Sequence, residues 1–163
     1  MATDRGKTCS FTGRKDDKHC CPSVEVASLS PGELVLARSR ALGCGDFGFV
    51  YDSYHPDSNF RHLFPDRRAY QQYGENALGG EFRILECRVL REDAVAETAR
   101  VMFYLDTLYR GERRESIEVG HFACRAGRWL YMMGEKGDRK AFPSDLAGIE
   151  WEDFERLKEP FVF

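Results

Sequence analysis

The stretch from residue 113 to residue 134 constrains this chain most, because it is typical of a β-hairpin. Residues 116–124 and 129–133 are rich in β-branched and aromatic side chains, and they flank the polar segment 125–128. Gly127 can adopt the positive φ that a tight hairpin loop requires. We expect the two arms to lie in the middle of a sheet or close to it, so the domain is organised around β-structure.

The residues ahead of this hairpin also predict strands. From Phe82 onward, apolar and charged side chains alternate with a period of two, and residues 95–105 form a long segment with one apolar face. Turns are predicted at Glu92-Asp93 and at residues 110–112. Together with the hairpin, these segments predict an antiparallel meander of at least four strands.

Three helices are predicted before the strands. Ser30 and Glu33 form a capping-box pattern at the start of the first helix, which Gly43 is expected to terminate. Asp46 is placed to cap a second helix with one aromatic face, and the third is expected over residues 66–77. Helices followed by antiparallel strands indicate an α+β fold, with the helices on one face of the sheet.

A curved sheet closed by N-terminal helices would form a cone with an internal cavity, which suits small ligands. Residues 57–64 are expected to be a loop between the second and third helices, and residues 135–140 a solvated connector. Residues 149–158 predict a short amphipathic helix. The apolar residues 160–163 are expected to dock on their own domain or on a second subunit, since burying one phenylalanine contributes about 1.5–3 kcal/mol.

Composition limits the classes of protein to consider. The chain has 163 residues, of which 42% are hydrophobic, and this suits one compact domain with short appendages. A net charge of -3 provides no general attraction to nucleic acid or to an anionic membrane. No apolar run approaches the roughly 20 residues of a membrane span, and the first residues do not resemble an export signal. We therefore expect a soluble cytoplasmic protein.

Three of the six cysteines cluster near the N-terminus, in a polar segment too short to have a core. They are Cys9, Cys20 and Cys21. Without an export signal, such a cluster indicates reduced thiols or a metal site rather than a disulfide framework. Thiolates from a short loop can converge on zinc, and His19 could supply a fourth donor. The alternative interpretation is a flexible tail without metal.

The candidate pocket residues are Arg38, His55, Glu118, Phe122 and Trp129. Arg38 lies on an apolar helix stripe, so it could bind an anionic group, or it could pair with Glu118 across the cone. His55 could act as an acid or base, or it could simply bind backbone carbonyls at a helix end. Glu118 shares a strand face with Phe122, and Trp129 belongs to an aromatic pair that is either core or ligand wall.

Four blocks of sequence resemble one family. Residues 36–42 (LARSRAL), 53–56 (SYHP), 118–122 (EVGHF) and 127–131 (GRWLY) are similar to blocks of the YchJ-like proteins. Those proteins often join a SEC-C zinc motif to a domain of nuclear transport factor 2-like (NTF2-like) fold. The resemblance covers roughly residues 29–134 and implies an NTF2-like cone, but it implies no established activity.

The N-terminal cysteines resemble an incomplete SEC-C motif. Cys9, Cys20 and Cys21 stand at its first, third and fourth ligand positions, whereas Phe11 stands at the second. The resemblance implies zinc as a cofactor, with His19 as the substitute ligand. The expected organisation is a degenerate SEC-C-like knuckle or tail, a linker, an NTF2-like domain and a C-terminal extension with a short helix, over residues 1–22, 23–29, 30–134 and 135–163.

We expect a nonenzymatic protein that binds a small ligand or acts as an adaptor, because no catalytic triad, phosphate-binding loop or pair of catalytic carboxylates emerges. One alternative is an isomerase, dehydratase or hydrolase that uses His55 or Glu118 as proton carrier and Arg38 as anion anchor. A structural homodimer is the other. An unknown small ligand or protein is the expected partner, and nucleic acid and membranes are not.

Overall fold

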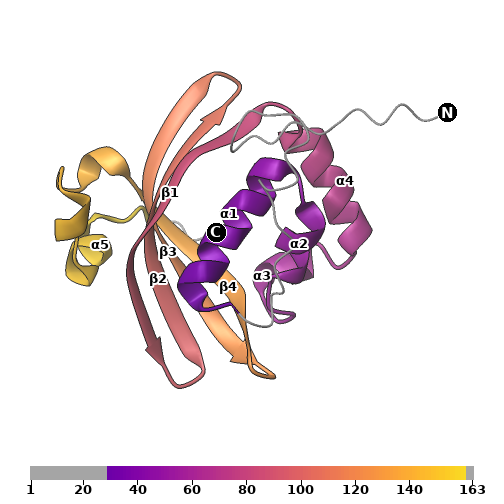
Figure 1. The fold of residues 1–163 in the computed structure, drawn as a ribbon, viewed down its shortest axis with the longest axis horizontal. Helices are drawn as coiled ribbons and strands as arrows, with labels where there is room; N and C mark the ends of the chain where they lie inside the picture. Colours follow the sequence, from indigo (N-terminus) through magenta and orange to yellow (C-terminus); the bar gives the residue numbers. More distant parts are fainter. Residues whose placement is uncertain (1–28, 161–163) are drawn as a thin grey trace.

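The computed structural model describes residues 29–160, which form one antiparallel sheet with helices on both faces (Figure 1). The sheet is a meander of order β1-β2-β3-β4, which confirms the predicted succession of four strands. Register shifts in the β1-β2 and β3-β4 pairs add residues to one strand only and increase the curvature of the sheet. The strands are β1 (Phe82–Val95), β2 (Thr98–Tyr109), β3 (Glu112–Arg125) and β4 (Arg128–Asp138).

Two-residue loops connect neighbouring strands. In the central hairpin, Gly127 has φ 77°, as predicted, and the preceding Ala126 has φ 52°. The predicted turn at Glu92-Asp93 is wrong, because both residues lie inside β1 and pair with β2. The chain turns instead after Val95, where Ala96 takes a φ of 53°.

The central hairpin extends further, and lies closer to the sheet edge, than the sequence suggested. Of the two arms of this hairpin, β3 is an interior strand, whereas β4 forms one edge of the sheet. The predicted connector at residues 135–140 is also wrong in its first part, because β4 continues to Asp138. Asp138 lies opposite Ser116 of β3 and Glu135 lies opposite Val119, so this polar segment is still paired with β3.

Four helices precede the sheet, one more than predicted. They are α1 (Pro31–Cys44), α2 (Phe47–Asp52), α3 (Asn59–Leu63) and α4 (Arg67–Leu78). The capping box at Ser30 and the cap at Asp46 are confirmed. Gly45, with φ 76°, ends α1 in place of Gly43, which is buried in the last turn. The additional helix α3 begins at Ser58, whose hydroxyl accepts a hydrogen bond from the Arg61 backbone N–H.

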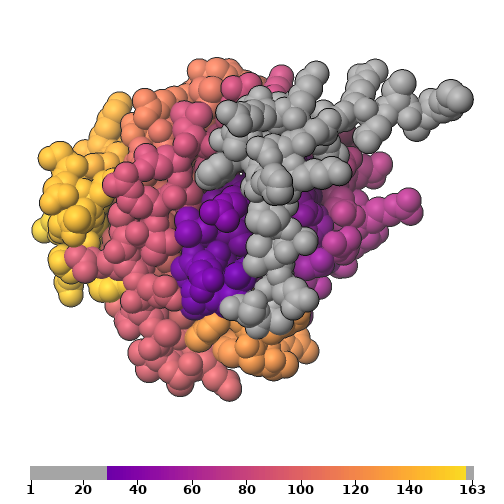
Figure 2. Space-filling view, viewed as in Figure 1, coloured from indigo at the N-terminus to yellow at the C-terminus, as the bar shows by residue number. Residues whose placement is uncertain are grey.

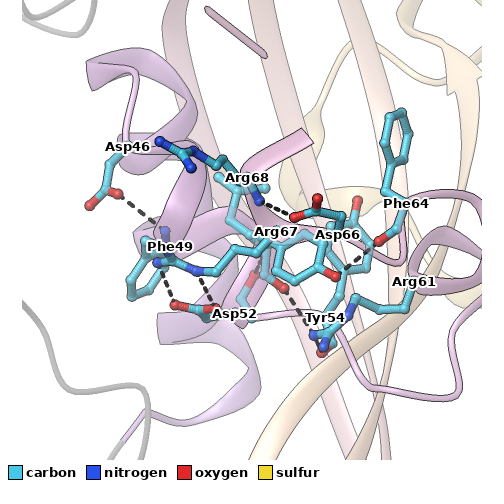
Figure 3. Close-up of polar contacts among 12 residues, drawn as sticks. Asp46, Phe49, Asp52, Tyr54, Arg61, Phe64, Asp66, Arg67 and Arg68 are labelled. Atoms are coloured by element: carbon cyan, nitrogen blue, oxygen red, sulfur yellow. Dashed lines mark hydrogen bonds and ion pairs between the residues drawn. The ribbon is translucent and has the colours of Figure 1, made fainter. Parts of the chain in front are cut away.

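Polar contacts tie the three shorter helices into one unit (Figure 3). Arg67 of α4 binds both carboxylate oxygens of Asp52 at 2.9 Å. The Tyr51 hydroxyl of α2 donates to the Phe64 carbonyl after α3, and Arg61 donates to the Tyr54 carbonyl. These contacts fix the positions of α2, α3 and α4 relative to one another.

The sheet separates two hydrophobic cores. On the concave face, Leu34 and Val35 of α1 pack on alternate residues of β2 and on Phe122. On the opposite face, residues 139–157 form a second layer that packs on Met102 and Ile117. That layer contains two 3-10 turns and the helix α5 (Trp151–Leu157), which confirms the predicted C-terminal helix. Figure 2 shows α1 (indigo) near the centre of the molecule and the C-terminal layer (yellow) at the left, across the sheet from α1.

Candidate functional site

The concave face of the sheet carries a groove of about 570 Å³ beyond the part that α1 covers. We call it the inner groove. It lies where β2 and β4 end and where β3 begins, and residues of all three strands line it. The residues used below are Leu105, Thr107, Ser116, Glu118 and Lys136.

A second hollow of about 650 Å³ lies between α3 and the edge strand β4. We call it the edge hollow. Glu118 and Lys136 line it as well as the inner groove, so the two spaces meet at this pair. The remaining wall is largely apolar and includes Phe60, Leu63, Tyr131, Met132 and Met133.

Glu118 is the central polar group of the combined cavity. It lies between Phe103 of β2 and Lys136 of β4 in the ladder. Its half-buried carboxylate accepts a 2.8 Å hydrogen bond from the Ser116 hydroxyl and forms no ion pair within residues 29–160. Burial raises the pKa of Glu118, although the Ser116 hydrogen bond and the charge of Lys136 oppose that rise. The carboxyl group is therefore an acceptor that still faces open space.

Arg38 does not reach Glu118, and the predicted charge pair across the cone is wrong. The Arg38 guanidinium lies 4.4 Å from the ring centre of Tyr54 and 4.0 Å from that of Tyr131. It also donates to the Ser53 hydroxyl and to the Val50 carbonyl. The aromatic faces and neutral oxygens satisfy this buried cation, so Arg38 is not available as an anion anchor.

The other candidate residues lie away from Glu118. His55 has its side chain 13% exposed, and its Nδ1 accepts a hydrogen bond from the Asp57 backbone N–H. Phe122 is 2% exposed and belongs to the core below α1, where Trp129 also packs. Of the five predicted pocket residues, only Glu118 lines the combined cavity.

The predicted separation of Glu118 and His121 on opposite faces of β3 is confirmed. His121 faces the C-terminal layer, where its Nε2 lies 2.7 Å from Glu135. Lys158 binds the other oxygen of Glu135 at 2.8 Å. These three groups belong to the docking of the C-terminal layer and not to the cavity.

Sequence reasoning missed the second half of the cavity. The sequence predicts a solvated connector around Lys136, and it predicts no role for Met132 and Met133 beyond the end of a strand. Phe60 and Leu63 lay in a predicted loop. The period of two does continue through residues 134–138, and that signal could have placed Lys136 on the face of Glu118.

No group of three or more His, Cys, Asp or Glu side chains that could hold a metal ion occurs within residues 29–160. The predicted zinc ligands Cys9, His19, Cys20 and Cys21 lie outside the described residues. In that same part of the chain, no helix has the length and apolar character needed to cross a membrane.

A curved antiparallel sheet with helices over its concave face defines an NTF2-like protein. The family model described as "YchJ, middle NTF2-like domain" matches residues 30–134, more than half of the chain. The protein therefore belongs to this YchJ-like family, as the sequence blocks predicted. The C-terminal layer, from residue 135 onward, lies beyond the matched part.

A solved structure has a similar fold. It is the solution structure of RPA3114, a SEC-C motif-containing protein from Rhodopseudomonas palustris. The two share 24% sequence identity with a TM-score of 0.55, and the similarity covers 78% of this chain and 97% of the other. None of the curated proteins matches this sequence.

Proposed function

We propose that this protein is a nonenzymatic binding protein whose inner groove takes a small ligand with an apolar body and a hydrogen-bond donor, such as an ammonium group. The observation that carries the proposal is the Glu118 carboxyl group, which accepts one hydrogen bond and faces the junction of the two hollows. Leu105 and the methyl group of Thr107 supply apolar contact on the floor beside it.

The ligand class follows from the chemistry of the acceptor. Burial disfavours the ionised form of Glu118, so a donor that enters the groove would recover part of the lost hydration. A cationic donor would gain most, because charge-assisted hydrogen bonds contribute about 1.5–3 kcal/mol. An anionic group would instead be repelled by Glu118.

An enzyme that uses Glu118 as a general base remains the second candidate, because a carboxyl group with a raised pKa in a cavity is suited to proton transfer. Within residues 29–160, the other predicted catalytic groups do not share its space: Arg38 is enclosed by tyrosines, and His55 binds the backbone. A binding role requires only Glu118, whereas an enzymatic role would require further groups beside it. We therefore favour the binding role.

Benzylamine and phenylacetate are matched probes of this proposal, since they share an aromatic body and differ in the sign of their charge. We expect benzylamine to shift the backbone amide NMR signals of Ser116 and Lys136, and phenylacetate to leave them in place. Glu118→Gln should weaken benzylamine binding by about 10-fold to 100-fold, the equivalent of one charge-assisted hydrogen bond.

Glu97→Gln is the control, because Glu97 is exposed in the β1-β2 turn, far along the strands from Ser116. It should bind benzylamine as the unaltered protein does. Equal binding of the two probes, or unchanged benzylamine affinity in Glu118→Gln, would refute the proposal. Chemical conversion of a bound amine, lost in Glu118→Gln, would favour the enzyme instead.

A further inference from the structure

Among residues 29–160, the outer edge of β4 has backbone partners at two points and none between them. Near its start, Tyr131 exchanges two backbone hydrogen bonds of 2.8 Å with the segment that follows α2. Near its end, the Lys136 carbonyl accepts a 2.8 Å hydrogen bond from the Glu159 backbone N–H. The four residues 132–135 lie between these points, and an open strand edge is a template for one more strand.

The chain after α5 approaches this edge in the antiparallel sense. The carbonyl of Leu157 lies close to Gly137, and Glu159 then binds Lys136, so residue numbers rise on one segment as they fall on β4. In an antiparallel ladder every second residue presents both backbone groups to the same side. After Lys136, the next residue of β4 with its N–H and C=O facing outward is therefore Gly134.

Pro160 is compatible with this register. If Glu159 is opposite Lys136, Pro160 falls at the position whose backbone nitrogen points away from β4, where the missing N–H has no consequence. The following residue, Phe161, falls opposite Gly134. Its N–H and C=O would then face those of Gly134.

The edge hollow provides a site for the Phe161 side chain. Residues directly opposite each other in an antiparallel pair project to the same face, so a ring at position 161 would lie over Gly134, on the face of Lys136. Gly134 has no side chain there, and the Tyr131 hydroxyl occupies the space of the missing Cβ. Leu63 borders the same hollow with 77% of its surface exposed, which is unusual for a large apolar residue.

We propose that residues 161–163 (Phe-Val-Phe), which lie beyond the described part of the chain, add to the edge of β4 of the same molecule as a short fifth antiparallel strand. Phe161 pairs with Gly134, and its ring fills the edge hollow against Leu63. The length is sufficient, because the open edge between Tyr131 and Lys136 spans about 16 Å and three extended residues cover about 10 Å. This added strand leaves the floor of the inner groove uncovered.

Two proline variants test the register. Phe161→Pro removes the N–H that would bind the Gly134 carbonyl, whereas Val162→Pro removes an N–H that points away from β4. We expect the Gly134 amide hydrogen to exchange with solvent at least about 10-fold faster in Phe161→Pro than in the unaltered protein. In Val162→Pro its rate should change by less than about 3-fold.

The Val119 amide, which lies in the interior of the sheet opposite Glu135, reports on the whole fold and should exchange equally in all three proteins. Equal exchange of Gly134 in the two proline variants would overturn the proposal. Protection of Gly134 that increases with protein concentration would also overturn it, because the edge would then be covered by a second copy of the chain.

Discussion

At the residue scale, Arg38 is the side chain whose role differs most from its expected one. It is 9% exposed and connects three elements: its own helix α1, the Ser53-Tyr54 segment after α2, and Tyr131 of β4. A planar guanidinium can stack on two aromatic rings and still donate in its own plane, which a lysine ammonium cannot do. Arg38 therefore belongs to the structural framework of the cone.

Arg38→Lys should lower the free energy of unfolding by about 1–2 kcal/mol, because stacking and in-plane hydrogen bonds are both lost while the charge remains buried. Urea denaturation measures this change. The control is Arg68→Lys, an exposed arginine of α4, which should change the free energy by less than about 0.5 kcal/mol. Equal effects of the two substitutions would show that the tyrosine contacts contribute nothing to stability.

At the element scale, a partly buried ionic cluster attaches the C-terminal layer to the sheet. Glu135 of β4 is 9% exposed and binds both His121 of β3 and Lys158 after α5. Burial by itself raises the pKa of Glu135, but the hydrogen bonds from Lys158 and His121 outweigh it and lower the pKa below its usual value. The cluster therefore makes the attachment of α5 dependent on pH.

Because the folded state lowers the pKa of Glu135, its contribution to stability is present above the unfolded-state pKa of about 4.3 and is lost as pH falls through the lower, folded-state pKa. Glu135→Gln should reduce the free energy of unfolding by about 1–2 kcal/mol at pH 6.5 and by clearly less at pH 3. Urea denaturation at the two pH values measures the difference.

Glu152→Gln, which alters an exposed carboxylate of α5, is the control for that comparison. Its effect should be below about 0.5 kcal/mol at both pH values. A difference between Glu135→Gln and the unaltered protein that is the same at pH 6.5 and at pH 3 would contradict the role given to the carboxylate.

At the scale of the whole molecule, residues between Leu29 and Leu157 form the two cores that flank the sheet within the described part of the chain. The cysteine cluster near the N-terminus lies outside this part of the chain. We propose that Cys9, Cys20 and Cys21 supply three thiolates to zinc and that His19 or water supplies the fourth ligand, because Phe11 cannot coordinate a metal. Such a site would be independent of the stability of the main fold.

Zinc removal should therefore leave the main unfolding transition in place. We expect freshly purified protein to contain less than one equivalent of zinc, and a chelator to shift the calorimetric midpoint by less than about 1 °C. Cys20→Ser should lose the metal, whereas Cys124→Ser, in β3, should retain it. A zinc content below about a tenth of an equivalent after expression with added zinc would contradict the proposal.

Local chemistry in the sequence was sufficient to predict most of the elements, although not α3 or the end of β4. Ser30 and Asp46 begin helices because the groups that cap a helix lie within three residues of each other, and Gly127 turns a hairpin because it has no Cβ. The period of two placed Glu118 and His121 on opposite faces of β3. The family blocks likewise predicted the NTF2-like cone before any packing was known.

Only the tertiary structure decided which polar residues meet. Arg38 and Glu118 were both expected inside the cone, but the tyrosines that enclose Arg38 lie 16 and 93 positions further along the chain. Lys136 lines the cavity because the polar end of β4 pairs with β3, and this pairing places Lys136 beside Glu118. Capping and turn formation depend on neighbours in the sequence, whereas burial and ion pairing depend on which distant segments pack together, and a sequence pattern contains little information about that choice.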